Sequence, residues 1–297
     1  MERSRPCPAC SSRVARFLGD ARGLPVLRCA SCATLFVRAL PTPDEAFDYS
    51  SYYRAENLAT PEFVRTRIRE TLARFQSYRV GGALFDLGFG AGAFLDEARA
   101  SGWRTAGIEA SAPPVEQARA NGHDARLLAD LGSFDAASFD VVVATEILEH
   151  VEQPIELLQT ASRLLRTGGL LYLTTPAGDG LNGRLLGASW TTMAPPEHLA
   201  LFSRRGLDQL LATGGFRVVE ATTTGINPLE LLSAARRRVR PPQPGTASSP
   251  PVREMSSATI NELAMSNPLT SMVKRAVNGV LGVTGLGDTH KVFAEKL

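Results

Sequence analysis

The stretch ALFDLGFGAGAFLDEARASG, residues 83–102, decides the fold, because it changes from strand to helix across a glycine turn. ALFDLG has the apolar pattern of a buried strand, and AGAFLDEARASG has helical spacing and a terminal glycine. Glycines at such a turn let the backbone approach a ligand and point amide groups at it. In D-x-G-x-G-x-G the acid precedes the glycines, so Asp86 would repel a pyrophosphate and attract an ammonium group.

Strands and helices alternate along the rest of the chain. The further predicted strands are TAGIEA (105–110), ARLLAD (125–130), FDVVVAT (139–145), LLYLTTP (170–176) and FRVVEATTT (216–224). Helical patterns with caps and terminal glycines separate most of them, which predicts a parallel sheet with helices on both faces. HKVFAEK (290–296) is a last strand, expected at an antiparallel edge position if a long insertion precedes it.

Acidic residues end three successive predicted strands. Asp86 ends the first, Glu109 ends the second, where a carboxylate can accept both hydroxyls of a ribose, and Asp130 ends the third, where it could meet an adenine amine. Helix capping is the alternative, and it accounts for one such acid more easily than for three. A cofactor with an amino acid at one end and a nucleoside at the other suits all three.

The chain has four cysteines, Cys7 and Cys10 in CPAC and Cys29 and Cys32 in CASC. Each C-x2-C can place two sulfurs on one cation, and two of them complete a tetrahedral zinc site. FLGDARGLPVLR between them predicts a turn with two short strands, as in a zinc ribbon. A region of roughly 40 residues cannot build its own core, so the metal would supply folding energy. Four thiolates leave no coordination position for substrate, which makes the site structural; four unrelated buried cysteines are the alternative.

Taken together, several motifs resemble those of the class I S-adenosylmethionine-dependent methyltransferases. They are LFDLGFGAG, GIEAS, FDVVVATEILEHVEQP, LLRTGGLLYLTTP and EHLALFSRRGLDQLLATGGF. The resemblance covers about residues 83–224 and the last strand. It implies an α/β, Rossmann-like, seven-stranded and mostly parallel sheet whose final strand is antiparallel. It extends to a subgroup of small-molecule enzymes with an N-terminal zinc ribbon and a tyrosine-bearing segment like FDYSSYYRAEN.

The resemblance also implies a cofactor, S-adenosylmethionine, and residues that bind it. Asp86, Gly88 and Gly90 would contact its methionine part, Glu109 its ribose and Asp130 its adenine. Phe89 departs from the family pattern, which has a small residue or a cysteine there. The full expected set is Asp86, Gly88, Phe89, Gly90, Gly92, Glu109, Asp130 and Glu146.

TEILEH (145–150) is the candidate for catalytic chemistry. Glu146, Glu149 and His150 have the spacing i, i+3, i+4, so they would share one face of a helix that begins here. Two carboxylates and an imidazole at the end of a core strand are costly to bury unless something uses them. His198, in APPEHLALFS, follows strand 170–176 and should open over the same edge of the sheet.

Three interpretations of this group stay open. Either His150 or His198 is a general base that takes a hydroxyl proton, with Glu146 beside it. Or a divalent cation, magnesium or manganese, is bound by Glu146, Glu149, His150 and His198 and holds two substrate oxygens. The E-x-x-E-H pattern with a distant histidine resembles the metal sites of small-RNA 2′-O-methyltransferases and of ubiquinone-pathway O-methyltransferases. In the third interpretation Glu149 is solvated and His150 is only packed.

Three other residues receive smaller roles. Trp190, in GASWTTMAPPEH, could cover an apolar substrate. His123, in ANGHDARLL, is predicted to lie at the surface, and His290 beside the last strand is given no role.

The expected organisation is a zinc ribbon (1–40), a helical linker or lid (41–80) and a methyltransferase domain (81–297) with a helical or flexible insertion (225–287). The insertion could be a lid, a dimer face, an interfacial membrane helix or plain core. The N-terminus lacks the apolar segment of a secretion signal, and no apolar run is long enough to span a membrane, so a cytoplasmic protein is expected.

The expected function is methyl transfer to a small molecule such as a sugar, polyketide or phenol, most readily at oxygen. The alternatives are transfer to carbon or nitrogen, methylation of RNA held by the ribbon, and a scaffold that binds the cofactor without turnover. A net charge of +2 does not favour nucleic acid. The RNA alternative stays open because the ribbon carries four arginines, Arg13, Arg16, Arg22 and Arg28. Asp86 disfavours a nicotinamide-dependent dehydrogenase.

Overall fold

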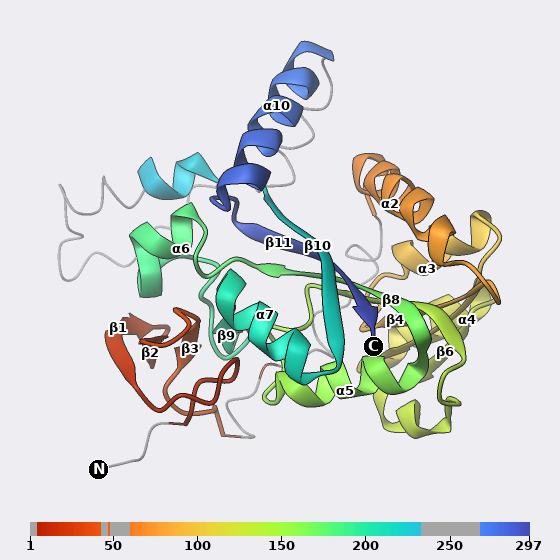
Figure 1. Cartoon of the computed structure of the whole chain (residues 1–297), viewed down its shortest axis with the longest axis horizontal. Helices are drawn as coiled ribbons and strands as arrows, with labels where there is room; N and C mark the ends of the chain where they lie inside the picture. Colours follow the sequence, from red (N-terminus) through yellow and green to blue (C-terminus); the bar gives the residue numbers. More distant parts are fainter. Residues whose placement is uncertain (1–4, 43–46, 48–59, 233–267) are drawn as a thin grey trace.

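The structure, a computed structural model, describes residues 5–42, 47, 60–232 and 268–297, with side chains of the last helix from Ala276 onward. Within these residues a central seven-stranded sheet has the order β10-β11-β8-β7-β4-β5-β6 (Figure 1). Its strands are β4 (Ala83–Leu87), β5 (Arg104–Glu109), β6 (Asp124–Leu127), β7 (Phe139–Thr145), β8 (Leu165–Pro176), β10 (Phe216–Thr224) and β11 (Thr289–Lys296). The predicted mostly parallel α/β sheet is confirmed.

The last strand is antiparallel, as predicted, but its place in the sheet is not an edge. β11 pairs antiparallel with β8 on one side and with β10 on the other. The edge prediction was therefore wrong. β10 occupies the edge instead. Because β11 lies between β8 and β10, the backbone hydrogen-bonding groups on both sides of β11 are paired.

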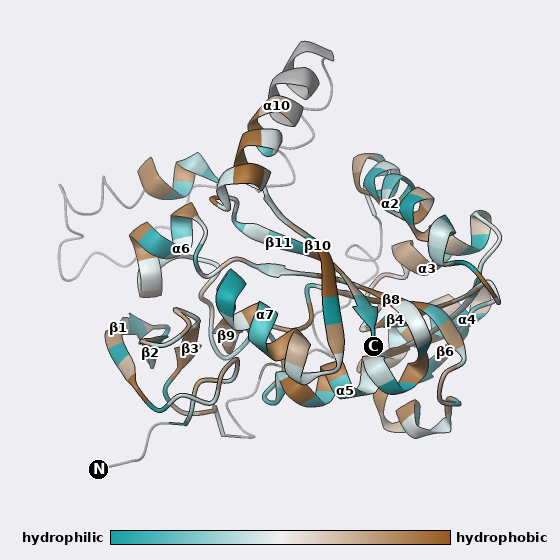
Figure 2. Ribbon diagram, viewed as in Figure 1, coloured by the Kyte–Doolittle hydropathy of each residue, from teal (hydrophilic) through white to brown (hydrophobic). Residues whose placement is uncertain are grey.

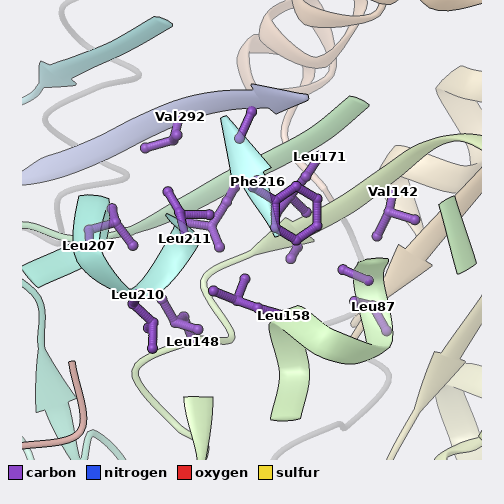
Figure 3. Packing of buried hydrophobic residues seen from close by; sticks show 14 of the residues in the cluster. Leu87, Val142, Leu148, Leu158, Leu171, Leu207, Leu210, Leu211, Phe216 and Val292 are labelled. Atoms are coloured by element: carbon purple, nitrogen blue, oxygen red, sulfur yellow. The ribbon is translucent and has the colours of Figure 1, made fainter. Parts of the chain in front are cut away.

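Helices cover both faces of the sheet, while α10 projects away from it and α6 lies towards the ribbon (Figure 1). The helices are α2 (Glu62–Phe75), α3 (Ala93–Ala100), α4 (Ala112–Ala120), α5 (Pro154–Leu164), α6 (Leu181–Leu186), α7 (Arg204–Thr213) and α10 (Pro268–Thr284), with short 3-10 turns η3 (Gln76–Tyr78), η4 (Leu128–Ser133) and η5 (Gly187–Ser189). Side chains alternate across the strands, so Val142 packs towards α5 and α7 while Val141 and Val143 pack towards α2 and α3. Figure 3 shows the first of these layers, where Leu158 of α5 and Leu211 of α7 are fully buried.

The predicted ribbon strands are present, and they belong to a second sheet with the order β1-β2-β3-β9. β1 (Ala15–Ala21), β2 (Leu24–Cys29) and β3 (Leu35–Val37) come from the ribbon, whereas β9 (Ala200–Leu201) comes from the chain after β8. Cys7, Cys29 and Cys32 are buried in the same hydrophobic cluster as the α5 and α7 layer. The ribbon therefore packs as part of the main core.

Two expectations fall partly or wholly outside the described residues. The tyrosines Tyr49, Tyr52 and Tyr53 lie outside them, and so do residues 233–267 of the insertion. The described end of the insertion forms α10, which packs against β10, where the Thr223 hydroxyl donates to the Leu281 carbonyl at 2.7 Å. Figure 2 shows apolar residues on the described part of this helix where it meets the sheet. Within the described residues no helix is long and apolar enough to cross a membrane.

Candidate active site

A cavity of about 570 Å³ opens at the carboxyl ends of β4, β5 and β7. This is the edge at which doubly wound sheets bind ligands. The predicted residues that line it are Gly88, Phe89, Gly90, Glu109, Glu146, Glu149, His150 and His198, and Phe47, Leu128, Leu131 and Glu197 line it as well. The fold thus brings the cofactor loop and the candidate catalytic residues to one cavity.

The glycine loop has the backbone that its sequence predicts. Gly88, Gly90 and Gly92 have φ angles of 72°, 52° and 77°, in the left-handed region that glycine adopts without strain. A Cβ atom on Gly88 would lie 2.4 Å from Cδ1 of Ile147, so the loop is also closely packed against TEILEH. Phe89 is buried because Gly107 of β5 leaves room for its ring; a Cβ there would lie 2.8 Å from that ring.

Replacing Gly88 with alanine should therefore distort the loop where it faces the cavity. We expect S-adenosylmethionine affinity to fall by about tenfold or more, since left-handed strain costs about 1–2 kcal/mol before the clash with Ile147 is added. Gly23→Ala is the matched control, because Gly23 also has a positive φ, of 84°, but a Cβ atom added there would have nothing within 4 Å. Calorimetric titration with S-adenosylmethionine compares a substituted glycine that lines the cavity with one that has open space around it. Equal affinities in the two variants would contradict the role of Gly88 in cofactor binding.

Asp86 and Glu109 lie near each other in the paired strands β4 and β5, but they differ in how many hydrogen bonds they accept. Asp86 is 1% exposed, and within the described residues its Oδ1 atom has no hydrogen-bond partner. Burial and the nearby Glu109 raise the pKa of Asp86 to about 8. Glu109 accepts hydrogen bonds from the amides of Gly90 at 2.9 Å and Ala110 at 2.7 Å. Asp86 and Gly92 are not among the residues that line the cavity. Asp86 lies in β4 directly before the lining residues Leu87 and Gly88, and its unsatisfied buried carboxyl suits the ammonium group of an amino-acid-bearing cofactor.

Asp130 does not share this arrangement. β6 ends at Leu127, so the predicted strand 125–130 was too long, and Asp130 lies exposed in the η4 turn. Its neighbours Leu128 and Leu131 line the cavity, which gives this end an apolar wall suited to a purine. The adenine contact of Asp130 stays a prediction.

TEILEH does not begin a helix. Residues 146–150 form an irregular turn, in which the His150 amide donates to the Ile147 carbonyl at 3.0 Å, and α5 starts only at Pro154. Glu146 has a φ of 50°, a strained conformation for a non-glycine residue, which is found most often at functional sites. The helical prediction was therefore wrong in its geometry, although the turn still gathers the same residues.

Two threonines at the end of β8 hold the carboxylates of this turn. The Thr174 hydroxyl donates to Glu146 at 2.7 Å, and the Thr175 hydroxyl donates to Glu149 at 2.8 Å. These supporting residues were missed, and the only signal for them was the pair of consecutive threonines at the end of a buried strand. Glu146 is exposed to the cavity, whereas Glu149 is 1% exposed and keeps one oxygen, Oε1, without a hydrogen bond among the described residues.

Glu149, His150 and His198 each direct a ligand atom to one place, and these atoms lie within 4.8 Å of one another. The two imidazole rings meet edge to face, with centroids 4.6 Å apart. Each ring is oriented by a backbone carbonyl, since Nδ1 of His150 lies 3.0 Å from the Glu197 oxygen and Nδ1 of His198 contacts the Thr192 oxygen. A neutral imidazole that donates through Nδ1 carries a lone pair on Nε2, the arrangement usual for metal-binding histidines.

The pKa values of the group shift in the directions that suit a cation. Burial raises the pKa of Glu149 well above its usual range, and the nearby Glu146 adds to the effect. Desolvation by the cavity walls also raises the pKa of Glu146, although its side chain is exposed to the cavity itself. Burial and the neighbouring His198 lower the pKa of His150 to about 4. A bound divalent cation would favour the ionised form of both carboxylates and the neutral form of the imidazole. It would therefore offset the cost of burying the carboxylates in their ionised form.

Trp190 and His123 are placed differently from their predictions, and His290, which was given no role, lies in the last strand. Trp190 is 3% exposed and packs in the cluster between the ribbon and residues 186–201, so it does not cover the cavity. His123 is buried, with Nε2 3.1 Å from Asp96 and Nδ1 2.7 Å from Thr105, because a short polar network satisfies both of its nitrogens. His290 is also buried and lies 3.1 Å from the Phe202 carbonyl oxygen.

The four cysteines converge as their spacing predicts. Sγ of Cys7 lies 3.6 Å from Sγ of Cys32, and Sγ of Cys10 lies 3.5 Å from Sγ of Cys29. All four sulfurs lie within 4.8 Å of one another, and all four cysteines are free of disulfides. A tetrahedral zinc ion with bonds of about 2.3 Å requires sulfurs at roughly this separation, so the cluster fits a structural zinc site.

Comparisons with known proteins all find methyltransferases. The profile of the family described as "Methyltransferase domain" matches residues 61–221. A ubiquinone biosynthesis O-methyltransferase of Xanthomonas oryzae pv. oryzae (strain PXO99A) is 30% identical over 103 residues, which are 32% of this chain and 43% of that protein. The 27-O-demethylrifamycin SV methyltransferase of Amycolatopsis mediterranei (strain S699) is 32% identical over 143 residues, 43% of this chain and 53% of that protein. The chain thus spans about half the length of the curated relatives it matches.

A solved structure agrees in fold. That of a SAM-dependent methyltransferase from Archaeoglobus fulgidus matches with a TM-score of 0.53 and 18% identity, covering 84% of this chain and 100% of that one.

Proposed function

The chain belongs to the methyltransferase domain family, and we propose that it transfers the methyl group of S-adenosylmethionine to an oxygen of a small-molecule acceptor. The observation that carries this proposal is the buried carboxyl of Asp86 beside the glycine loop, with one oxygen unsatisfied among the described residues. Asp86 would hold the cofactor ammonium, Glu109 its ribose hydroxyls, and Leu128 and Leu131 would enclose its adenine. When bound, the sulfonium supplies an electrophilic methyl group.

The protein's own contribution is to exclude water, align the acceptor and manage its proton. Glu146, Glu149, His150 and His198 all line the cavity, and ligand atoms of the last three lie within 4.8 Å of one another, so an acceptor bound beside them would meet this group. His150 alone is a poor proton acceptor at neutral pH, because its pKa is lowered to about 4. The same neutrality makes it a good metal ligand.

We therefore favour a divalent cation, magnesium or manganese, over a simple histidine base. Glu149, His150 and His198 would bind the cation and Glu146 would lie beside it, leaving positions for two acceptor oxygens. A cation at this place would lower the pKa of an acceptor hydroxyl and so favour oxygen over carbon. The names of the ubiquinone and rifamycin relatives, both O-methyltransferases, support the same choice. Phenols with adjacent oxygens are the acceptor class that such a cation fits best.

The four cysteines, in this proposal, bind a structural zinc ion. RNA as an acceptor receives less support, because one of the four arginines that keep it open is engaged within the protein. Arg28 donates to the Gly183 carbonyl at 2.9 Å.

Methyl transfer from labelled S-adenosylmethionine to a panel of catechols and matched monophenols tests the proposal. We expect transfer to catechols, loss of that transfer in a chelator too weak to remove the ribbon zinc, and recovery with added magnesium or manganese. Undiminished transfer in the chelator would contradict the cation, and transfer confined to carbon, nitrogen or RNA acceptors would contradict the acceptor class.

A further inference from the structure

His198 lies in a segment whose backbone is held by other parts of the chain. The Leu199 amide, next to His198, donates to the Glu149 carbonyl at 2.8 Å. The Leu199 carbonyl accepts from the Val37 amide of β3 at 3.1 Å and from the Arg5 guanidinium at 3.2 Å. One residue thus joins the TEILEH turn on one side to the ribbon on the other.

The ribbon also holds the far end of this segment. Leu35 and Phe36 of β3 pair with Leu201 and Ala200 of β9. Beyond β9, the Ser203 hydroxyl contacts the Cys32 carbonyl and lies 3.4 Å from the Thr34 hydroxyl.

The same serine, Ser203, connects the ribbon segment around Cys32 and Thr34 to α7. Ser203 caps this helix by accepting from the Gly206 amide at 3.0 Å. Thr34 and Ser203 are both almost fully buried, so these hydrogen bonds are not exchanged readily for water.

We infer that the four-cysteine ribbon positions the acceptor half of the active site: β3 and Arg5 hold residues 199–201, and thereby His198, against Glu149 and His150. This inference rests on the proposed function, because only that function makes His198 part of an active site. Its test measures hydrogen exchange and needs no methyl transfer. The part of the cavity proposed to bind the cofactor is built from β4, β5 and β6. These strands follow β7 in the order β7-β4-β5-β6 of the central sheet, and they do not pair with the ribbon sheet. Loss of the ribbon metal should therefore loosen His198 and leave the cofactor loop in place.

Hydrogen exchange of the full-length chain, with its zinc and after zinc removal, tests this separation. Without zinc we expect the amides of residues 199–201 to exchange about tenfold faster or more, and those of β4 and β5 to keep their protection. The metal content of the protein, measured in parallel, shows whether zinc was present and removed. The inference is overturned if residues 199–201 keep their protection after zinc has been removed. It is also overturned if they are equally protected in a chain that never held zinc.

Arg5→Ala provides a second measurement that does not depend on unfolding the ribbon. Arg16→Ala is the matched control, because Arg16 is exposed on β1. In Arg5→Ala we expect faster exchange at residues 199–201 and a shifted ring signal of His198, whose ring lies against His150. His198→Gln assigns that signal among the four histidines of the chain.

The two variants also separate this inference from the proposed function. Calorimetric affinity for S-adenosylmethionine should be the same in Arg5→Ala, in Arg16→Ala and in the wild type, since neither arginine lines the cavity. An unshifted His198 signal with unchanged exchange in Arg5→Ala overturns the positioning role. Absence of cofactor binding in the wild type would instead refute the proposed function and leave the exchange result standing.

Discussion

Replacing Asp86 with asparagine is expected to weaken S-adenosylmethionine binding by about 100-fold, and also to stabilise the cofactor-free protein. The affinity falls because the buried carboxylate that would meet the cofactor ammonium is lost, and a hydrogen bond between charged groups contributes about 1.5–3 kcal/mol. The side chain keeps its size, so the glycine loop above it need not move. Calorimetric titration with S-adenosylmethionine measures the first effect.

The stabilisation has a pH dependence whose sign follows from the raised pKa of Asp86. A carboxyl that titrates near pH 8 when folded and near pH 4 when unfolded binds more protons in the folded state between these values. Its contribution is therefore neutral below about pH 4, falls by about 1.4 kcal/mol per pH unit above that, and levels off above about pH 8. Asp86→Asn removes this penalty, so the variant should gain stability over the wild type as pH rises through that window.

Denaturant unfolding at several pH values measures this second effect. Asp124→Asn serves as the control, because Asp124 is exposed and pairs with Arg126 at the surface. A wild-type-like affinity in Asp86→Asn would show that Asp86 is not the cofactor's partner, and parallel stability curves for variant and wild type would contradict the raised pKa of Asp86.

Replacing Glu149 with glutamine should abolish most of the activity while sparing the cofactor. The amide oxygen can still accept from Thr175, which donates to Glu149 at 2.8 Å, so the turn should keep its shape. The negative charge beside His150 and His198 is lost, and with it a ligand of the proposed cation. We expect manganese affinity to fall by about 100-fold and turnover by about 10²–10⁴-fold.

Manganese binding, followed by electron paramagnetic resonance, reports the metal site without any acceptor. Glu152→Gln is the control, since Glu152 is an exposed carboxylate three residues after Glu149, just beyond the turn. Calorimetry should give both variants the S-adenosylmethionine affinity of the wild type. Equal manganese binding in Glu149→Gln and Glu152→Gln would remove Glu149 from the metal site and return the chemistry to a histidine base.

Local sequence patterns were sufficient for most of the elements and for bringing most of the predicted site residues to one cavity, while their roles stay predictions. The alternation of apolar runs with helical patterns predicted the sheet strands, and the positions of Gly88, Gly90 and Gly92 predicted the cofactor loop. Register and strand order were harder, because they depend on pairings between distant segments. The placement of β11 between β8 and β10 is one such case.

The TEILEH turn shows how residues can be predicted to lie together from a local geometry that the structure does not have. Spacing of i, i+3, i+4 predicts a shared helical face, but here a tight turn gathers Glu146, Glu149 and His150. The turn is stabilised by threonines of the neighbouring β8. No local pattern contains that partner, since the hydrogen bonds join residues that are far apart in the chain.

By itself the sequence determined the α/β alternation, the acid and glycines at the end of β4, and the two cysteine pairs, because each depends on residues a few positions apart. Only the tertiary structure decided that His198 meets His150, that Trp190 packs away from the cavity, and that the ribbon contributes three strands to a sheet completed by β9. These results follow from burial and strand pairing between segments separated by many residues, where the stability of the whole core selects one arrangement among many that local preferences allow.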